Sequence, residues 1–263
     1  MNNGVMNWWN RRSDEYFKDI QIGLEQIAEN AEDAFPVVVW KMISNEFPDL
    51  RGKRVLVPSS GDNIAVFGFH LLGAEVTSCD IAERQLANAK KIADSNGWNI
   101  EFIQQDSMTL DAVQDGKYDL VYTSNGVHVW INDLPKMYRN FNRVLKPGGS
   151  YIMFETHPFG RPFDDSGTEI KVRKPYEDTG PFVSGEETTF GWRVMDLFNA
   201  VFDSGFNITH MEEFSPGKEE YDNYFYSHHQ EAKEDGYKKH DWKQNPWAAL
   251  PQCIGFTATK GGK

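Results

Sequence analysis

The residues best placed to do chemistry in this 263-residue chain are Asp80 and the small polar residues of 58–63. The stretch 58–63 reads PSSGDN and follows an apolar run, and Asp80 ends the next apolar run along the chain. Between them lie a helix-length apolar segment and Gly73. Such a unit can hold the sugar of a nucleoside, because loop amides face the ligand and the acid accepts hydrogen bonds from two ribose hydroxyls. The alternative reading of Asp80 is a cap for the helix that follows it.

Repeated strand and helix patterns are expected to position these residues. The apolar runs predict strands over 54–58, 75–80, 100–104, 118–124, 150–155, 207–214 and 252–259. Helices are expected over 63–72, 82–96, 134–144 and 192–204, with a short helix between the third and fourth strands and a turn at KPGG, residues 146–149. This alternation predicts an α/β fold with a Rossmann-like, mostly parallel seven-stranded sheet and helices on both faces.

Two segments outside this alternation are expected to form a lid. Residues 1–53 predict an N-terminal helical cap, with helices over 7–30 and from Pro36, before a core of 54–263. The core carries insertions at about 157–191 and 215–250. The aromatic residues of 7–35, among them Trp8 and Trp9, and those of 215–250 predict that both segments cover the edge where the strands end.

Composition limits the classes of partner. The formal net charge is −12, from 27 basic and 39 acidic residues, which does not favour a nucleic-acid partner. No apolar run is long enough to cross a membrane, and no signal peptide is recognisable. Cys79 and Cys253 are expected to be buried free thiols. A cytoplasmic protein acting on a small molecule is the expectation, and the oligomeric state stays open.

Three segments resemble the class I S-adenosylmethionine-dependent methyltransferases. They are FNRVLKPGGSYIMFE at 141–155, DLVYTSNGVHVW at 119–130 and CDIAERQLANAKKIA at 79–93. The resemblance runs from about Arg54 to Lys260. The first loop departs from the family pattern, because Val57 replaces an acid, Ser59 and Asn63 replace glycines, and only Gly61 is kept.

The resemblance implies S-adenosylmethionine as cofactor and a role for each matching residue. Asp80 would hold the ribose and Ile81 would lie on the adenine. Asp106 would accept from the adenine amino group beside Ser107 and Met108. The remaining expected cofactor residues are Ser59, Ser60, Gly61, Asn63, Ser124 and Asn125. Plain loop roles stay open for Asp106 as an Asx turn and for Ser124 and Asn125 as a strand exit.

Two histidines are candidates for catalysis. His128 follows the fourth strand and His157 follows the fifth, and imidazole can act as a base near neutral pH. Either could instead be structural. No metal is expected, since His228, His229 and His240 lack carboxylate or cysteine partners at suitable spacing.

The function expected is in-line methyl transfer from S-adenosylmethionine to a small-molecule acceptor. The family's Asn/Asp-Pro-Pro-Tyr/Phe tetrad for amino-group and nucleic-acid acceptors is absent, and Ser124-Asn125-Gly126-Val127 stands there. Two alternatives stay open. The chain could bind a nucleoside ligand without catalysis, or it could be a nicotinamide-linked dehydrogenase, although it lacks G-x-G-x-x-G.

Overall fold

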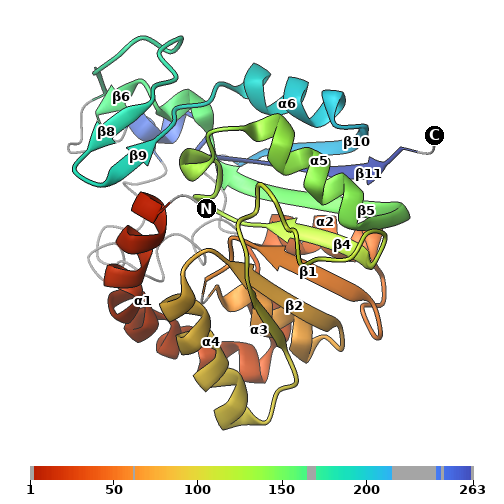
Figure 1. The fold of residues 1–263 in the computed structure, drawn as a ribbon. Coiled ribbons are helices and arrows are strands. Elements are labelled where there is room, and N and C mark those ends of the chain that lie inside the picture. Colours follow the sequence, from red (N-terminus) through yellow and green to blue (C-terminus); the bar gives the residue numbers. More distant parts are fainter. Residues whose placement is uncertain (1–2, 62, 165–169, 215–240, 244–245, 262–263) are drawn as a thin grey trace.

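A computed structural model describes residues 3–61, 63–164, 170–214, 241–243 and 246–261, and its centre is a seven-stranded sheet (Figure 1). The strands lie in the order β10-β11-β5-β4-β1-β2-β3. They are β1 (Arg54–Pro58), β2 (Glu75–Asp80), β3 (Glu101–Gln104), β4 (Tyr118–Thr123), β5 (Leu145–Thr156), β10 (Phe206–Phe214) and β11 (Cys253–Lys260). Neighbouring strands from β5 to β3 are parallel, whereas β11 is antiparallel to both β5 and β10. The expected mostly parallel sheet is confirmed.

Alternation along the strands divides the core into two layers. Val55 and Val57 point into one core with the helices α1 (Asn3–Glu29), α2 (Val37–Glu46), α3 (Ile64–Leu71) and α4 (Glu83–Asn96). Leu56 points into the other core, with α5 (Leu134–Val144) and α6 (Val194–Asp203). Successive side chains of a strand alternate between its faces, so strands buried on both sides read as continuous apolar runs.

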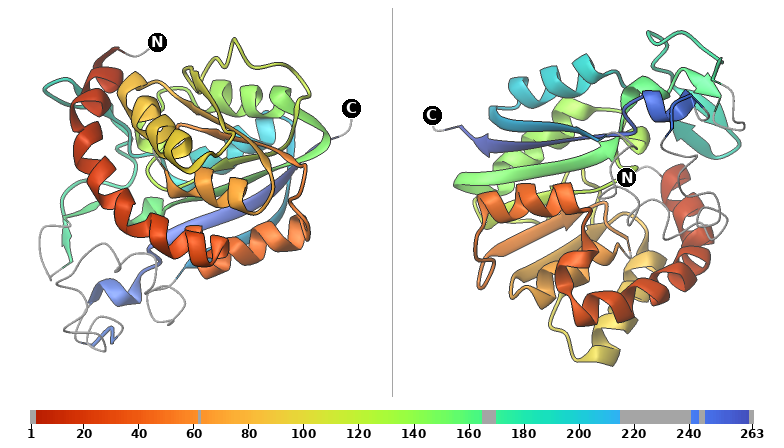
Figure 2. Two further views of the ribbon diagram at one scale, coloured as in Figure 1. Left: turned by 90° about the horizontal axis from the view of Figure 1, so that it is seen from below. Right: turned by 180° about the vertical axis from the view of Figure 1, so that it is seen from behind.

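Segments outside the sheet gather where the parallel strands end. The helix α1 leads from the N-terminus past α4 to η1 (Ala31–Ala34) and α2 (Figure 2). After β5 come η3 (Pro158–Gly160) and two small hairpins, β6 (Phe163–Asp164) with β7 (Lys171–Val172) and β8 (Phe182–Ser184) with β9 (Glu187–Thr189). Both α1 and these hairpins lie at the edge where β1, β2 and β5 end (Figure 1). The expected lid segment 215–250 falls largely outside the described residues. Within the part of this segment that is described, Pro246–Ala249 form the short helix η5.

Two local expectations were wrong. The KPGG sequence was predicted as a turn before the fifth strand, but it lies inside β5 as an irregularity: Leu145 pairs with Tyr118 and Ser150 pairs with Leu120. Gly148, at φ +72°, allows the extra residues to fold out of the ladder. No short helix forms in residues 105–117, all of which the structure describes, and Leu110 there adopts φ +46°.

Cys79 and Cys253 are free and buried, as expected. Within the described residues, no helix is long and apolar enough to cross a membrane.

Candidate functional site

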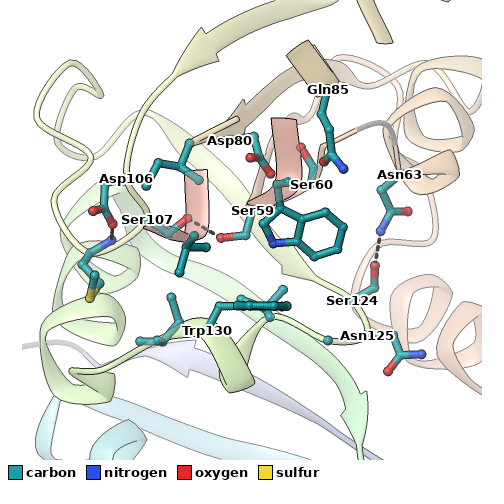
Figure 3. A pocket seen from close by; sticks show the side chains of 17 residues that line it. Ser59, Ser60, Asn63, Asp80, Gln85, Asp106, Ser107, Ser124, Asn125 and Trp130 are labelled. Carbon is teal, nitrogen blue, oxygen red and sulfur yellow. Dashed lines mark hydrogen bonds between the residues drawn. The ribbon is translucent and has the colours of Figure 1, made fainter. Parts of the chain in front are cut away.

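A cavity of about 240 Å³ lies at the carboxyl ends of β1, β2, β3 and β4 (Figure 3). Every residue that the sequence suggests for cofactor binding, except Gly61, lines this cavity. Strand ends of an open parallel sheet are where ligands of α/β proteins bind, because the loops there diverge. The structure therefore brings together side chains that are up to 66 positions apart in the sequence, from Ser59 to Asn125.

Asp80 is a buried carboxylate held by backbone donors. It is 7% exposed, its Oδ1 accepts from the Ala82 N–H at 2.7 Å, and its Oδ2 accepts from the Gly61 N–H at 2.8 Å. Burial raises the pKa of Asp80 to about 6, although these N–H groups partly oppose the rise. Each carboxylate oxygen has a second lone pair, so the group can also accept from a ligand hydroxyl. The helix-capping contact and a ligand contact are thus compatible.

The loop after β1 takes its shape from two left-handed residues. Ser59 has φ +51° and Gly61 has φ +50°. A Cβ on Gly61 would lie 1.9 Å from Oε1 of Gln85, which is itself buried and lines the cavity. Glycine is therefore favoured at this position by its backbone conformation, and a larger residue would also displace the Gln85 side chain.

The hydroxyl and amide groups of this loop bind neighbouring loops. Ser59 Oγ lies 2.6 Å from Ser107 Oγ, and Ser60 Oγ lies 2.8 Å from Ser78 Oγ. Asn63 caps α3 by accepting from the Ala65 N–H and donates its Nδ2 hydrogen to Ser124 Oγ (Figure 3). These contacts tie the ends of β1, β2, β3 and β4 into one rigid rim.

Asp106 forms the opposite end of the cavity. It is 7% exposed, and its Oδ1 accepts from the Met108 N–H at 2.9 Å, the contact that an Asx turn makes. Asn140 of α5 donates to the Met108 carbonyl at 2.7 Å. The loop is thus fixed from the helix side, with Ser107 and Met108 facing the cavity.

Aromatic residues close the cavity on the side of α1. Trp9 and Val5 of α1 line it, as does Trp130. The ring centroids of Trp8 and Trp9 lie 4.9 Å and 5.6 Å from Trp130, respectively. The sequence pointed to aromatic residues of 7–35 at this edge, and α1 meets that expectation.

Contacts with the β8–β9 hairpin fix this end of α1. Trp8 Nε1 donates to Glu187, and Arg11 pairs with Glu186 at 2.6 Å.

Several lining residues were missed by sequence reasoning. Gln85 and Val5 lie inside helices, where nothing in the pattern separates a lining position from a packing position. Gly126, Val127 and Ile131 follow β4 and could have been found as neighbours of Ser124 and Asn125, which share their loop.

Both candidate catalytic histidines are buried, and neither lines the cavity. The Nδ1 atom of His128 lies 2.9 Å from Glu155, and its Nε2 lies 2.7 Å from the Tyr138 hydroxyl. The Nδ1 atom of His157 accepts from the Phe159 N–H, which leaves the hydrogen on Nε2 facing Glu213 at 3.0 Å. Both nitrogens of each ring have protein partners, so this geometry favours structural roles.

No group of histidine, cysteine and acidic side chains suited to a metal ion occurs among the described residues. His228, His229 and His240 lie outside those residues.

Comparison with known proteins shows similarity to methyltransferases. A family described as "Methyltransferase domain" matches residues 59–149, which include most of the cavity rim. A crystal structure of an S-adenosylmethionine-dependent methyltransferase from Mesorhizobium loti has the same fold, with a TM-score of 0.63 and 21% identity over 84% of this chain and 96% of that chain. The reversed strand β11 between β5 and β10 separates this sheet from the 3-2-1-4-5-6 order of dinucleotide-binding dehydrogenases.

Residues 59–149 thus match a methyltransferase domain, and the chain has the fold of a solved S-adenosylmethionine-dependent methyltransferase. By its name, the Mesorhizobium loti protein depends on S-adenosylmethionine. The cavity fits such a group, because it offers a buried acid at the end of β2, a second acid at its other end, and both polar and aromatic walls.

Relatives of known sequence share parts of the chain. The uncharacterized methyltransferase YbaJ of Bacillus subtilis is 25% identical over 62% of this chain and 69% of its own length. The demethylmenaquinone methyltransferase of Thermus thermophilus is 32% identical over 40% of this chain and 48% of its own. The chain thus spans between about half and two thirds of these relatives.

Two of the similar proteins have names that do not refer to methyltransferases. GalD of Rhizobium meliloti, named as a galactose dehydrogenase, is 37% identical over 34% of this chain and 37% of its own length. The structure of the [4+2]-cyclase SpnF has a TM-score of 0.57 and 17% identity over 85% of this chain and 80% of that chain.

Proposed function

We propose that this protein transfers a methyl group from S-adenosylmethionine to a small-molecule acceptor. The observation that carries the proposal is the buried Asp80 carboxylate at the tip of β2, inside a cavity whose rim is cross-linked by hydrogen bonds. Burial raises the pKa of Asp80 to about 6, so the ionised acid is held in an apolar setting with backbone donors alone. A ligand that donates two hydroxyl hydrogens to this carboxylate would relieve that cost.

The other lining residues divide into roles along the cavity. Asp106, Ser107 and Met108 would bind the adenine, with Ile81 against its face. Ser59, Ser60 and Asn63 would shape the loop that binds the amino-acid end of the cofactor. Their side chains already form hydrogen bonds with Ser107, Ser78 and Ser124, respectively. Ser124 and Asn125 would lie nearest the reacting end, because their loop continues to Trp130, which packs against Trp9 of α1.

When bound, the cofactor supplies an electrophilic methyl group on a sulfonium ion. The protein's contribution is then to orient the acceptor and exclude water. Val5 and Trp9 from α1 and Trp130 supply an apolar wall suited to that exclusion. No residue that lines the cavity among those described is a lysine, arginine or histidine. The reaction is therefore proposed to proceed by positioning, without a side-chain base of that kind, and His128 and His157 are given no catalytic role.

A small acceptor is supported by three features. The cavity is partly enclosed under α1, and the net charge of −12 opposes binding to nucleic acid. The Thermus relative, by its name, acts on demethylmenaquinone, which is a small molecule.

One alternative has a specific observation in its favour. The [4+2]-cyclase SpnF shares the fold, so the fold by itself does not require methyl transfer. The altered first loop, with Ser59 and Asn63 at glycine positions, is consistent with a protein that binds the ligand without transferring its methyl group.

The test is a transfer screen with methyl-labelled S-adenosylmethionine and fractionated metabolite extracts. If the protein transfers the methyl group, the label should appear in a small-molecule product. S-adenosylhomocysteine should form in an amount equal to that product. The Asp80→Ala variant should lose both. Tight cofactor binding with no labelled product in any fraction would favour the non-transferring alternative.

A further inference from the structure

Glu155, at the end of β5, holds the loop after β4 from behind the cavity. Its side chain is buried, and it does not line the cavity. Its Oε1 accepts from the N–H of Gly126 at 2.7 Å, and its Oε2 accepts from those of Val127 at 2.9 Å and His128 at 3.1 Å. Three successive amides thus converge on one carboxylate, as in the backbone nests that bind anions.

The His128 ring completes this arrangement. Its Nδ1 lies 2.9 Å from Oε2 of Glu155, and because a carboxylate only accepts, the hydrogen is on Nδ1. The other ring nitrogen lies 2.7 Å from the Tyr138 hydroxyl of α5. Burial would raise the pKa of Glu155, but the hydrogen bond and electrostatic attraction of His128, with the backbone donors, lower it to about 2. The group is therefore a carboxylate at any pH of interest.

The orientation of these amides fixes the opposite side of the loop. In a trans peptide the C=O points away from the N–H of the same unit. Amides directed at Glu155 therefore turn the carbonyl groups of Asn125, Gly126 and Val127 away from it. These three residues line the cavity, and Gly126, at φ +89°, makes the sharp bend between them. The Val127 carbonyl accepts from the Trp130 N–H, so the loop that Glu155 holds is also bonded to a residue of the aromatic wall.

We propose that Glu155 is a positioning residue, which holds residues 125–127 so that the carbonyl oxygens of Asn125 and Gly126, rather than amide hydrogens, face the cavity. A wall of carbonyl oxygens suits a cationic methyl donor and an acceptor that donates an N–H or O–H hydrogen, whereas amide hydrogens would repel both. The inference deepens the proposed function and rests on it. It also gives the buried His128 a purpose, which is to orient Glu155.

The test compares Glu155→Gln with the wild-type protein. A glutamine of the same shape turns an NH₂ group toward N–H donors, so the loop must rearrange. Turnover per site, counted from the stoichiometry of S-adenosylhomocysteine binding, should fall at least tenfold. The Kd for S-adenosylhomocysteine should change less than threefold, because Asp80 and Asp106 are untouched. Hydrogen exchange of the amides of 126–128 should accelerate at least tenfold.

A control separates positioning from general loss of stability. Ile43→Ala removes volume from the core beneath α2, away from the cavity lining, and should lower Tm without changing turnover per site. Should Glu155→Gln fail to fold, Glu155→Asp keeps the charge but withdraws it by one methylene, and it should lower turnover per site severalfold.

The outcomes distinguish the two proposals. If the wild-type protein transfers the methyl group and the Glu155 variants have the same turnover per site, the positioning role is wrong but the proposed function stands. Unchanged exchange of 126–128 in Glu155→Gln would overturn it as well. A wild-type protein that binds no S-adenosylmethionine would overturn the proposed function, and the positioning role with it.

Discussion

At the scale of single residues, Asp80 is an acid that the fold buries at the end of β2. It has backbone donors on both oxygens, and burial still raises its pKa to about 6. Sequence alone predicted Asp80 as the ribose contact, because an acid at the tip of a second strand is a positional signal. It could not predict that Ser59 and Asn63 bind Ser107 and Ser124, since those partners meet only in the folded sheet.

The raised pKa of Asp80 predicts pH-dependent cofactor binding. Ribose hydroxyls bind the carboxylate better than the neutral acid, so affinity should be constant well above pH 6. Affinity should fall as the pH drops through about 6, approaching tenfold per pH unit below that value. Titration calorimetry with S-adenosylhomocysteine from pH 5 to 8 measures this. An Asp80→Asn variant should bind weakly with a flat profile, and a wild-type profile that is equally flat would contradict the role.

Asp106 predicts selectivity for the adenine. Asp106→Ala should weaken binding by about 1–2 kcal/mol, the value of one lost hydrogen bond. Adenosyl and inosyl analogues should then bind with similar affinity, because the exocyclic amine has lost its acceptor. Asp111→Ala, which removes an exposed acid from the same loop, is the control and should leave the preference intact. An Asp106→Ala variant that keeps the wild-type preference would exclude this residue as the acceptor.

At the scale of elements, strands and helices with strong apolar periodicity were predictable. The bounds of β1, β2 and α5 match the expectation, because each begins or ends at a clear signal such as Asp80 or the helix cap Asp133. The conformations of the KPGG segment and of the loop 105–117 were not predictable, because they depend on contacts with residues that are distant in the sequence. Arg143 of α5 donates to the carbonyls of Val113 at 2.9 Å and Leu110 at 3.0 Å, which satisfies loop backbone groups without a helix.

We predict that α1 closes the cavity and that its contacts with Glu186 and Glu187 hold it closed. Exposed pairs such as Arg11–Glu186 contribute only about 0–1 kcal/mol each, so the ion pair between α1 and the β8–β9 hairpin is weak. A Glu186→Gln/Glu187→Gln variant should release bound S-adenosylhomocysteine severalfold faster in stopped-flow displacement. Asp94→Asn, which breaks the exposed Lys90–Asp94 pair on α4, should not. Equal release rates for the latch variant and wild type would show that α1 does not gate the cavity.

At the scale of the whole molecule, the reversed strand β11 distinguishes this sheet from that of the dinucleotide-binding dehydrogenases. An acid at the end of the second strand occurs in both folds, but this chain also lacks the G-x-G-x-x-G loop of the dehydrogenases. The sequence predicted the strands but not their order, because pairing between β5 and β11 joins segments that are remote in the chain.

This architecture predicts which cofactor stabilises the protein. A ligand at 100 times its Kd adds about 2.7 kcal/mol to the free energy of unfolding. For a chain of this size that raises Tm by roughly 5–10 °C. S-adenosylmethionine or S-adenosylhomocysteine should produce this shift in a thermal melt, and NAD should produce none. A shift with NAD alone would reverse the assignment of ligand class.

The most direct test of the central claim is titration calorimetry of S-adenosylmethionine with wild-type protein and Asp80→Ala. One binding site per chain is expected in the wild-type protein. The variant should lose about 2–4 kcal/mol of binding free energy, and its circular dichroism should be unchanged. Equal affinity in the two proteins, or no binding to the wild-type chain, would contradict the assignment of this cavity as the cofactor site.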